Sequence, residues 1–559
     1  MHDLVIRNAL LLDGSKAPAR HGDLAVVGDR IVEIGSDVSS GRQEIDAEGL
    51  ALAPGIIDTH THYDAQVTWD PALTPSPAHG VTTVVIGNCG FTIAPCRPRD
   101  RELTMRNLTH VEGMSLEVLR RGIRWEFESF PEYMELLARL GSVPNLAAFV
   151  GHSSVRTFVM GEDATRRAAK PEEIARMKRL VAEAMQSGAI GFATSTAPQH
   201  NGEGGVPMPS RLADAGELGA LVGVLGEMGR GIFMLTKGPD SPVPYLETLA
   251  AATGRPVMIA ALLHNPVLPE ATFNDLAAIG AAQRRGHRLY GQISCCPLTN
   301  DFTMKSPYLF EGIAAWLPAM QAHGDDLKRV YADPGFRRRV TAELATPVAM
   351  RLFNNDWEKL DLLETARPEN RRYEGRSVAS LAEAAGKAPL DWLLDFALSE
   401  DLETVFTAVL LNTDEDAVGK MLRDPNASIA LSDAGAHLSF FCDVGFGLHL
   451  LGHWVRERQA LSLEEAVWQL SGRPAEIFGI QDRGRLAPGG AADLMLFDPA
   501  TIGRGPRRRV HDLPGGAARL TTDPRGLHGV WVNGTQVADG KGAIETSARP
   551  GKLLREFAA

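Results

Sequence analysis

The sequence predicts an α/β protein, a (β/α)8 TIM-like barrel with a small β-sandwich domain formed by both chain termini. From residue 55 to about residue 479, short apolar runs of strand type alternate with longer amphipathic segments, which is the pattern of parallel strands joined by helices. Both chain ends show short strands separated by turns instead. The length of 559 residues also exceeds what one hydrophobic core usually holds. We therefore expect a barrel and a second, smaller unit.

The two chain ends share the strand-and-turn pattern that predicts the smaller domain. Apolar stretches bounded by turn residues occupy 3–14, 23–35, 43–55, 484–499 and 527–542. We expect 1–54 and 484–559 to fold together as one discontinuous β-sandwich domain, and 55–483 to form the barrel.

Barrel strands are indicated by apolar runs that are followed by amphipathic segments. These runs lie at 81–88, 145–152, 189–196, 231–238, 255–264, 287–294 and 428–435. The clearest helix is 171–187, with Pro171 at its start and Gly188 just after its end. Residues 297–390 are too long for one connection between strands and carry scattered aromatic residues, so we expect an insertion that covers the barrel mouth.

Composition excludes several classes of protein. No apolar run approaches the roughly 20 residues that span a bilayer. The 57 basic residues are outnumbered by 69 acidic ones, so a nucleic-acid partner is not expected. Five cysteines, with Cys295 and Cys296 adjacent, do not form a disulfide framework and favour a reducing compartment. Because the start of the chain lacks a basic segment followed by a cleavable apolar one, we expect a cytoplasmic protein that acts on a small molecule, as a monomer or a homo-oligomer.

The strongest local signal is the run PGIIDTHTHYD at residues 54–64. A strand from Gly55 through His62 would point alternate side chains the same way, so His60 and His62 would face one side. Neutral imidazoles are good ligands for zinc and related ions. The alternative is a pair of core histidines, but the position at the end of an apolar strand favours a metal site.

A cysteine follows the next apolar run. In GVTTVVIGNCG, Cys89 lies between Gly87 and Gly90 after β-branched residues. A thiolate there could ligate one metal ion or bridge two. Taken alone, a single cysteine is as often a small buried apolar residue.

The third signal is IALSDAGAH, in which an apolar strand delivers Asp433, with His437 four residues later. A carboxylate beside a bound metal can ligate it and also take the proton from its water, as hydrolysis requires. The alternative is an aspartate that caps the following turn.

These motifs, in this order, resemble the amidohydrolase superfamily and, more narrowly, its D-aminoacylase (N-acyl-D-amino-acid deacylase) branch. The resemblance runs from the N-terminal strands to about Ser210 and resumes from about Ser428 to Lys541. The motifs that carry it are PGIIDTHTHYD, GVTTVVIGNCG, GHSSVR, EAMQSGAIGFATS, LSDAGAH and GRLAPGGAADLMLFDP.

The resemblance implies a zinc enzyme with one or two divalent ions, built as a barrel with a β-sandwich from both termini. Carried over to this chain, His60, His62 and Asp433 would be metal ligands and Cys89 would be the bridging ligand. The motif GHSSVR would place His152 and Arg156 near the substrate.

The middle of the chain departs from the family pattern. Where the family has a histidine in a Thr-His-Met-Arg context, LTKG puts Lys237 at the ligand position. Where the family has Ile-Ser-His-His-Lys, IAALLHN puts Ala261 at the second ligand position, with His264 three residues later. Together with His437, His264 is a further candidate for substrate contact.

Lys237 should project towards the metal site from the end of a strand. It would then either be carboxylated and serve as an anionic ligand, or stay protonated, occupy the second-metal position and bind the substrate. A third interpretation is a lysine that extends from the strand end to solvent.

The leading hypothesis is a metal-dependent hydrolase that cleaves the C–N bond of an N-acylated amino acid or a similar small molecule. Asp433 would accept a proton from water, and Arg156 could hold a substrate carboxylate or form an ordinary ion pair. The same site could instead open a cyclic amide or imide. A barrel that has lost catalysis and acts as a binding or scaffold protein is the third hypothesis.

Overall fold

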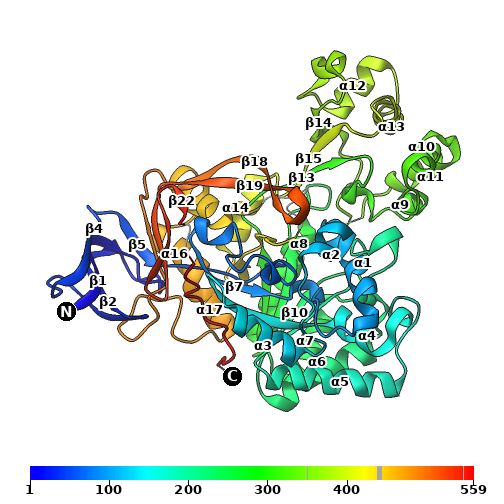
Figure 1. Cartoon of the computed structure of the whole chain (residues 1–559). Helices are drawn as coiled ribbons and strands as arrows, with labels where there is room; N and C mark the ends of the chain where they lie inside the picture. Colours follow the sequence, from blue (N-terminus) through cyan, green and yellow to red (C-terminus); the bar gives the residue numbers. More distant parts are fainter. Residues whose placement is uncertain (349–350, 437–442, 545–546, 559) are drawn as a thin grey trace.

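The computed structural model describes residues 1–559 apart from 349–350, 437–442, 545–546 and 559. A curved parallel sheet forms the centre of the molecule, and its strands neighbour one another in chain order (Figure 1). The strands are β6 (Ile56–Asp58), β7 (Val81–Ile86), β8 (Asn145–Gly151), β9 (Gly191–Ser195), β10 (Ile232–Thr236), β11 (Val257–Leu262), β12 (Leu289–Ile293) and β16 (Ala427–Ile429).

The barrel strands are buried along nearly their whole length, as parallel strands covered on both faces must be. Helices cover the outside of this sheet. They include α3 (Phe130–Leu140), α4 (His152–Met160), α5 (Pro171–Gln186), α6 (Ala215–Met228), α7 (Val243–Thr253), α8 (Glu270–Arg284) and α14 (Glu415–Arg423). The helix predicted at 171–187 is confirmed as α5.

The segments that follow the first and last barrel strands meet at the carboxyl end of the sheet. The backbone N–H of His62 donates to the carbonyl of Ala434 at 2.7 Å. Gly435 has a φ of 92°, and a Cβ there would lie 2.7 Å from the His62 carbonyl oxygen. Only glycine fits this close approach, which brings the loop after β16 onto the loop after β6.

Strands from both termini form one mixed sheet. Antiparallel pairing of β17 with β5 sets Leu494 opposite Pro54 and joins the two chain ends. The sheet contains β1 (His2–Leu11), β2 (Arg20–Val27), β3 (Arg30–Gly35), β4 (Gly41–Asp46), β5 (Ala51–Pro54), β17 (Leu494–Phe497), β20 (Leu527–Val532), β21 (Thr535–Asp539) and β22 (Gly542–Ala543). A long ribbon of β18 (Gly503–Leu513) and β19 (Ala517–Arg525) extends from this unit (Figure 1).

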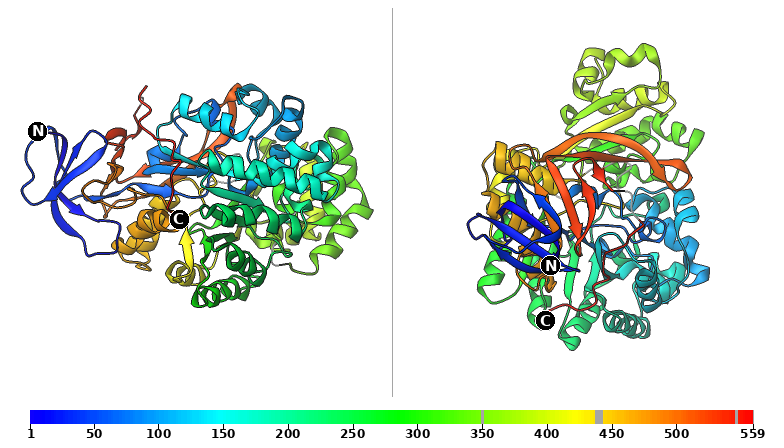
Figure 2. Two further views of the ribbon diagram at one scale, coloured as in Figure 1. Left: turned by 90° about the horizontal axis from the view of Figure 1, so that it is seen from below. Right: turned by 60° about the vertical axis from the view of Figure 1, so that its left-hand side comes forward.

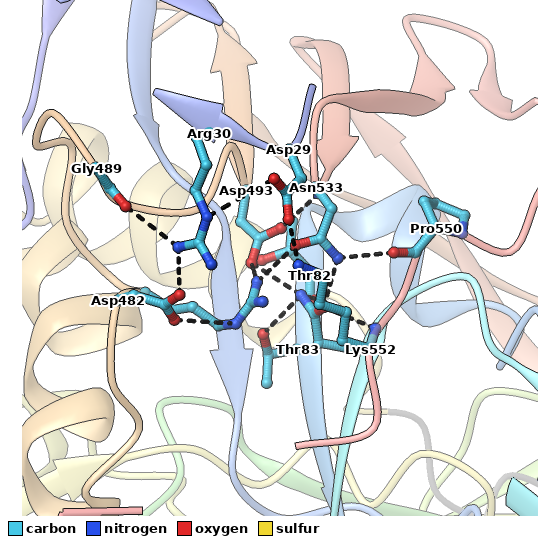
Figure 3. A network of polar contacts seen from close by, with 12 residues as sticks. Asp29, Arg30, Thr82, Thr83, Asp482, Gly489, Asp493, Asn533, Pro550 and Lys552 are labelled. Carbon is cyan, nitrogen blue, oxygen red and sulfur yellow. Dashed lines mark hydrogen bonds and ion pairs between the residues drawn. The ribbon is translucent and has the colours of Figure 1, made fainter. Parts of the chain in front are cut away.

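A buried polar network, here called the Asp493 network, ties the terminal unit to the amino ends of the barrel strands (Figure 3). Asp493 accepts hydrogen bonds from the Asn533 backbone at 2.7 Å and from Asn145 Nδ2 at 2.8 Å, and it pairs with Arg483. Asn145 is the first residue of β8, and its side chain also donates to the carbonyl of Thr82 at 2.9 Å.

The chain between β12 and β16 forms a separate lobe (Figures 1 and 2). Its own hydrophobic cluster runs from Leu298 to Leu411, so the lobe extends beyond the predicted limits of 297–390. The lobe contains β13 (Leu298–Thr303), β14 (Leu360–Glu364), β15 (Val405–Leu411), α9 (Leu317–Met320), α10 (Gly324–Ala332), α11 (Pro334–Leu344), α12 (Val378–Ala385) and α13 (Pro389–Ser399). The strand pairing is antiparallel, with β15 between β13 and β14.

Asn412 fastens the two ends of this lobe to the barrel. Its side chain donates to the carbonyls of Ser294 at 3.0 Å and Cys296 at 3.1 Å, which lie just before the lobe. It also accepts from the His264 backbone at 2.7 Å, and the Asn412 backbone donates to the His264 carbonyl at 2.9 Å. The first and last residues of the lobe are therefore held side by side.

The predicted division into 1–54 with 484–559 and 55–483 stays a prediction, although the cluster that includes Leu4, Leu52 and Leu494 draws on both termini. Among the described residues, no helix is long and apolar enough to cross a membrane.

Candidate active site

His60 and His62 lie just after β6, at the carboxyl end of the barrel. The strand ends at Asp58, earlier than predicted, yet the two imidazoles lie together, with ring centroids 5.3 Å apart. Their side chains are 3% and 1% exposed. The predicted convergence of the two histidines is therefore present in the fold.

Cys89 faces the same point from the turn after β7. It lies in the left-handed region at φ 57° within the turn Asn88–Gly90. Its Sγ is 3.6 Å from His60 Nε2 and 3.0 Å from Thr236 Oγ1. Burial opposes ionisation of the thiol, but the neighbouring imidazoles of His60 and His62 outweigh it and lower the pKa of Cys89 to about 7.

Asp433 completes the group from the loop after β16. Its Oδ1 lies 3.4 Å from His60 Nε2 and 3.6 Å from His62 Nε2. The following turn is capped by Ser432, whose hydroxyl accepts from the Ala434 backbone at 3.1 Å. The Asp433 carboxylate thus faces the histidines, and its side chain is 17% exposed.

Two residues outside the predicted set contact the histidines from behind. His60 Nδ1 donates to the Gln292 side-chain oxygen at 2.6 Å, which leaves the Nε2 lone pair directed at Cys89 and Asp433. Glu112 Oε1 lies 3.3 Å from His62 Nδ1, and both side chains are almost fully buried. Burial opposes protonation of His62, but the Glu112 carboxylate outweighs it and raises the pKa of His62 well above its usual value.

The donor atoms fit a divalent metal ion. In the described part of the chain, the grouping of three or more close ligand-type side chains is His60, His62 and Cys89, with donor atoms within 4.8 Å of one another. Zinc bonds of about 2.1 Å in a tetrahedron imply ligand-to-ligand distances of about 3.4 Å. The separations of 3.4 and 3.6 Å around Asp433 and Cys89 match that value.

These donors form the floor of a cavity whose wall comes from both the barrel and the lobe. The polar lining includes Gln199, His200, Thr236, Asn265, Ser294, Cys296, Tyr308, Arg351 and Asp443. The apolar lining includes Ala261, Leu263, Leu298, Leu352, Leu411 and Leu431. His200 is held by Ser195, whose hydroxyl lies 2.6 Å from its Nδ1.

The structure places Lys237 away from the predicted ligand position. The Lys237 ammonium pairs with Asp275 of α8, outside the cavity lining. The side chain that faces the site from the end of β10 is Thr236, one residue earlier. Because successive strand side chains point in opposite directions, a shift of one residue moves a side chain from the site to the helix layer.

His152 and Arg156, predicted to contact the substrate, lie outside the cavity lining. Both side chains are completely buried at the start of α4 and bind Glu217 of α6. His152 Nε2 is 2.9 Å from Glu217 Oε1, and its Nδ1 is 2.8 Å from Thr194 Oγ1. Burial lowers the pKa of His152 despite Glu217. Of the two interpretations of Arg156, a clamp for a substrate carboxylate or an ordinary ion pair, this geometry favours the ion pair.

The remaining predicted contacts differ in outcome. The His264 side chain is buried beside the cavity but is not part of its lining, where Leu263 and Asn265 lie on either side. Burial lowers its pKa. His437 lies outside the described residues. Ala261 does line the cavity, at the end of β11.

Sequence reasoning missed Gln292, Glu112 and Thr236. Gln292 had a signal, since it is a polar residue within the apolar run 287–294. Glu112 had none, because it follows α1 (Arg101–Val111) in a stretch without strand character.

The amidohydrolase family profile matches residues 43–538, and the chain belongs to this family. It is 30% identical over 568 residues to the N-acyl-D-aspartate deacylase of Alcaligenes xylosoxydans xylosoxydans, covering 99% of this chain and 95% of that one. It is also 30% identical over 578 residues to the D-aminoacylase of the same organism, covering 100% and 98%. The chain is therefore an enzyme of the amidohydrolase type, similar to N-acyl-D-amino-acid deacylases.

Solved structures agree with this assignment. A D-aminoacylase with a binuclear metal centre superposes with a TM-score of 0.69 at 26% identity, covering all of both chains. The N-acyl-D-glutamate deacylase of Bordetella bronchiseptica, complexed with zinc and a phosphonate inhibitor, gives 0.69 at 25% identity, covering 99% and 100%. The fold class and the family resemblance predicted from the motifs are confirmed.

Proposed function

We propose that this chain is a metal-dependent hydrolase that cleaves the amide C–N bond of an N-acyl-D-amino acid with water. The observation that carries the proposal is the convergence of His60, His62, Cys89 and Asp433 on the floor of a cavity at the carboxyl end of the barrel. The names of the relatives support the choice of an N-acyl-D-amino acid.

His60, His62 and Cys89 would hold a zinc ion beside the Asp433 carboxylate, and the bound ion would polarise the scissile carbonyl and lower the pKa of a water molecule to about 7. Asp433 is the most exposed of the three groups compared, at 17% against 3% and 1% for the histidines, so it can meet both water and substrate. Its carboxylate accepts the proton of the attacking water and then delivers that proton to the leaving nitrogen. The amine departs neutral, and Asp433 is regenerated.

The cavity wall favours an apolar side chain or acyl group on the substrate. Leu298, Leu352 and Leu411 of the lobe face the same space as Leu263 and Leu431 of the barrel. Arg351 also lines the cavity, but its guanidinium donates to the carbonyls of Glu343 at 3.2 Å and Thr346 at 3.0 Å within the lobe. Part of the hydrogen-bonding capacity of the Arg351 guanidinium is thus taken up by backbone carbonyls of the lobe.

A substrate panel tests the proposal. Amine release should be measured from N-acetyl-D and N-acetyl-L amino acids with apolar and acidic side chains, and from cyclic amides, with added zinc, manganese or cobalt. We expect turnover in the N-acetyl-D series, with leucine or phenylalanine above aspartate. Turnover of cyclic amides alone would replace the proposed substrate, and no turnover of any amide would contradict the proposal.

Two buried cysteines offer a matched pair of variants for the same assay. Cys89→Ser should lower both metal content and turnover, because a serine hydroxyl is a poor zinc ligand. Cys96→Ser should change neither, since Cys96 lies beside Thr104, with its Sγ 3.3 Å from that hydroxyl, outside the cavity lining. Equal metal content and turnover in the two variants would remove Cys89 from the site.

A further inference from the structure

The metal-ligand donors all come from three strand ends. His60 and His62 follow β6, Cys89 follows β7 and Asp433 follows β16. Since β6 neighbours β7 and the loops after β6 and β16 meet through the His62 to Ala434 hydrogen bond, these ends lie on one side of the barrel. Three donor pairs, His60–Asp433, His62–Asp433 and His60–Cys89, are 3.4 to 3.6 Å apart, which suits neighbouring ligands of a single ion.

A second ion bridged by Cys89 would need its own donors on the other side of the sulfur. The residue that approaches the sulfur from the end of β10 is Thr236, whose hydroxyl oxygen is 3.0 Å from Cys89 Sγ. A neutral hydroxyl is not among the thiolate, imidazole and carboxylate groups that hold zinc in proteins. The end of β10 therefore supplies a hydrogen-bond partner where a ligand would be required.

The next strand supplies no ligand either. Ala261, at the end of β11, lines the cavity with a methyl group. A carboxylated Lys237 would not reach the second-metal position from its present orientation, because its side chain points to Asp275. The other ligand-type residues on the described wall are His200, Cys296 and Asp443, and none of them joins the group of donor atoms within 4.8 Å of one another. Cys296 and Asp443 instead lie 3.5 and 3.9 Å from Arg504 Nη1.

We propose that the centre takes one divalent ion rather than two, and that Thr236 donates a hydrogen bond to the Cys89 thiolate and keeps it a terminal ligand. This proposal rests on the metal site of the proposed function. It sets the chain apart from the D-aminoacylase neighbour, which has a binuclear centre. In a bridged pair, a second cation helps to balance the negative charge of the thiolate. Here the hydrogen bond from the Thr236 hydroxyl would balance part of that charge instead.

Metal stoichiometry tests the proposal without relying on activity. The protein, freed of metal and reloaded with excess zinc, should retain one equivalent per chain after gel filtration, measured by mass spectrometry of the metal. Cobalt-loaded protein should show the electron paramagnetic resonance of an isolated ion. Two equivalents of retained zinc, or a spin-coupled cobalt pair, would overturn the one-ion proposal and leave the proposed function standing. Absence of both metal and turnover would overturn the proposed function itself.

Variants at Thr236 test the stated cause. Thr236→Val keeps the shape but removes the hydroxyl, so it should retain one equivalent of cobalt and shift the cobalt–thiolate charge-transfer band. An unchanged band would mean that the hydroxyl does not donate to the thiolate.

The double variant T236H/A261H adds two imidazoles at the ends of β10 and β11. It should retain a second equivalent of zinc, with folding checked by circular dichroism. A folded double variant that still holds one equivalent would show that these two positions are not what excludes the second ion.

Discussion

Two buried polar clusters lie at opposite ends of the barrel strands and differ in how well their groups are satisfied. In the Asp493 network, the side-chain amides of Asn145 and Asn533 each make hydrogen bonds through both the nitrogen and the oxygen. Asn145 Oδ1 accepts from Asn533 Nδ2 at 2.8 Å and from the Lys552 backbone at 3.0 Å. Asn533 Nδ2 also donates to the Pro550 carbonyl at 2.7 Å, and its oxygen accepts from Arg483 at 3.0 Å. Both side-chain amides are therefore satisfied by the network itself. Arg483 Nε is buried without a hydrogen bond, but it lies 3.7 Å from the Asp482 carboxylate.

The active-site cluster is incomplete by the same measure. Within the described residues, Glu112 Oε2, Asp58 Oδ2 and Asp64 Oδ1 are buried without a hydrogen-bond donor, and the contact of Glu112 Oε1 is with His62 Nδ1 at 3.3 Å. Burial raises the pKa of Asp58 to about 7 and likewise that of Asp64 to about 7. Acids gathered around two histidines and a thiol make a site that gains from a bound cation. The comparison teaches that the Asp493 network satisfies its charges and amides with its own groups, whereas the active-site cluster leaves several buried carboxylate oxygens that a cation can satisfy.

Asp493→Asn should give the largest change, and that change should be in stability. The substitution removes the buried counter-charge of Arg483 and leaves only the more distant Asp482, 3.7 Å from Arg483 Nε, and breaking a buried pair typically costs about 3–5 kcal/mol. Urea unfolding measures this loss, while turnover per folded molecule should be unchanged. Asp523→Asn is the control, because Asp523 pairs with Arg508 outside this network, is 56% exposed and should cost less than about 1 kcal/mol. A large loss of turnover without a loss of stability would break the comparison.

Asp433→Asn should act in the opposite way. An amide of the same shape cannot accept the proton of water, so turnover should fall by about a hundredfold or more. The urea midpoint should stay close to that of the unmodified protein, because Ser432 caps the turn. If turnover is retained and the midpoint falls instead, Asp433 belongs with the structural residues.

Zinc should stabilise the metal-free protein through the active-site cluster alone. At a free zinc concentration of 100 times Kd, binding to the folded state adds about 2.7 kcal/mol. The gain should be absent in Cys89→Ser and present in Cys96→Ser. It should also be unchanged in Asp493→Asn, since distant sites contribute additively. A smaller gain in Asp493→Asn would mean that the two clusters are coupled.

Lys237→Met should give the smallest effect. The pair of Lys237 with Asp275 is partly exposed, at 15% and 23%, so its loss should cost less than about 1 kcal/mol. Metal content and turnover should be unchanged. Loss of bound zinc in this variant would restore Lys237 to the metal site.

The sequence predicts the position of those site residues that directly follow a recognisable strand. His60, His62, Cys89 and Asp433 each follow an apolar run directly, so local pattern places them at the carboxyl end of the sheet. Lys237 shows the limit of this reasoning. The strand was recognised, but its last inward-facing residue is Thr236, and an error of one residue reverses the side chain.

Contacts between distant segments could not be predicted from local pattern. Arg156 binds Glu217, which lies 61 residues away, and His60 binds Gln292, 232 residues away. No local pattern reveals such a partner, and Glu217 turns the GHSSVR motif into a buried anchor between α4 and α6. The extent of the lobe depends on such a contact too, because Leu411 pairs with Leu298 across the sheet and packs in the lobe's hydrophobic cluster.

Asn412 has a consequence for how this enzyme can change over evolutionary time. By holding both ends of the lobe against one barrel loop, it makes residues 298–411 a closed excursion whose length costs the barrel little loop entropy. Most of the leucines on the cavity wall belong to this excursion, whereas the metal donors belong to the barrel. Descendants can therefore exchange or remodel the lobe to accept new substrates while the hydrolytic chemistry is inherited unaltered.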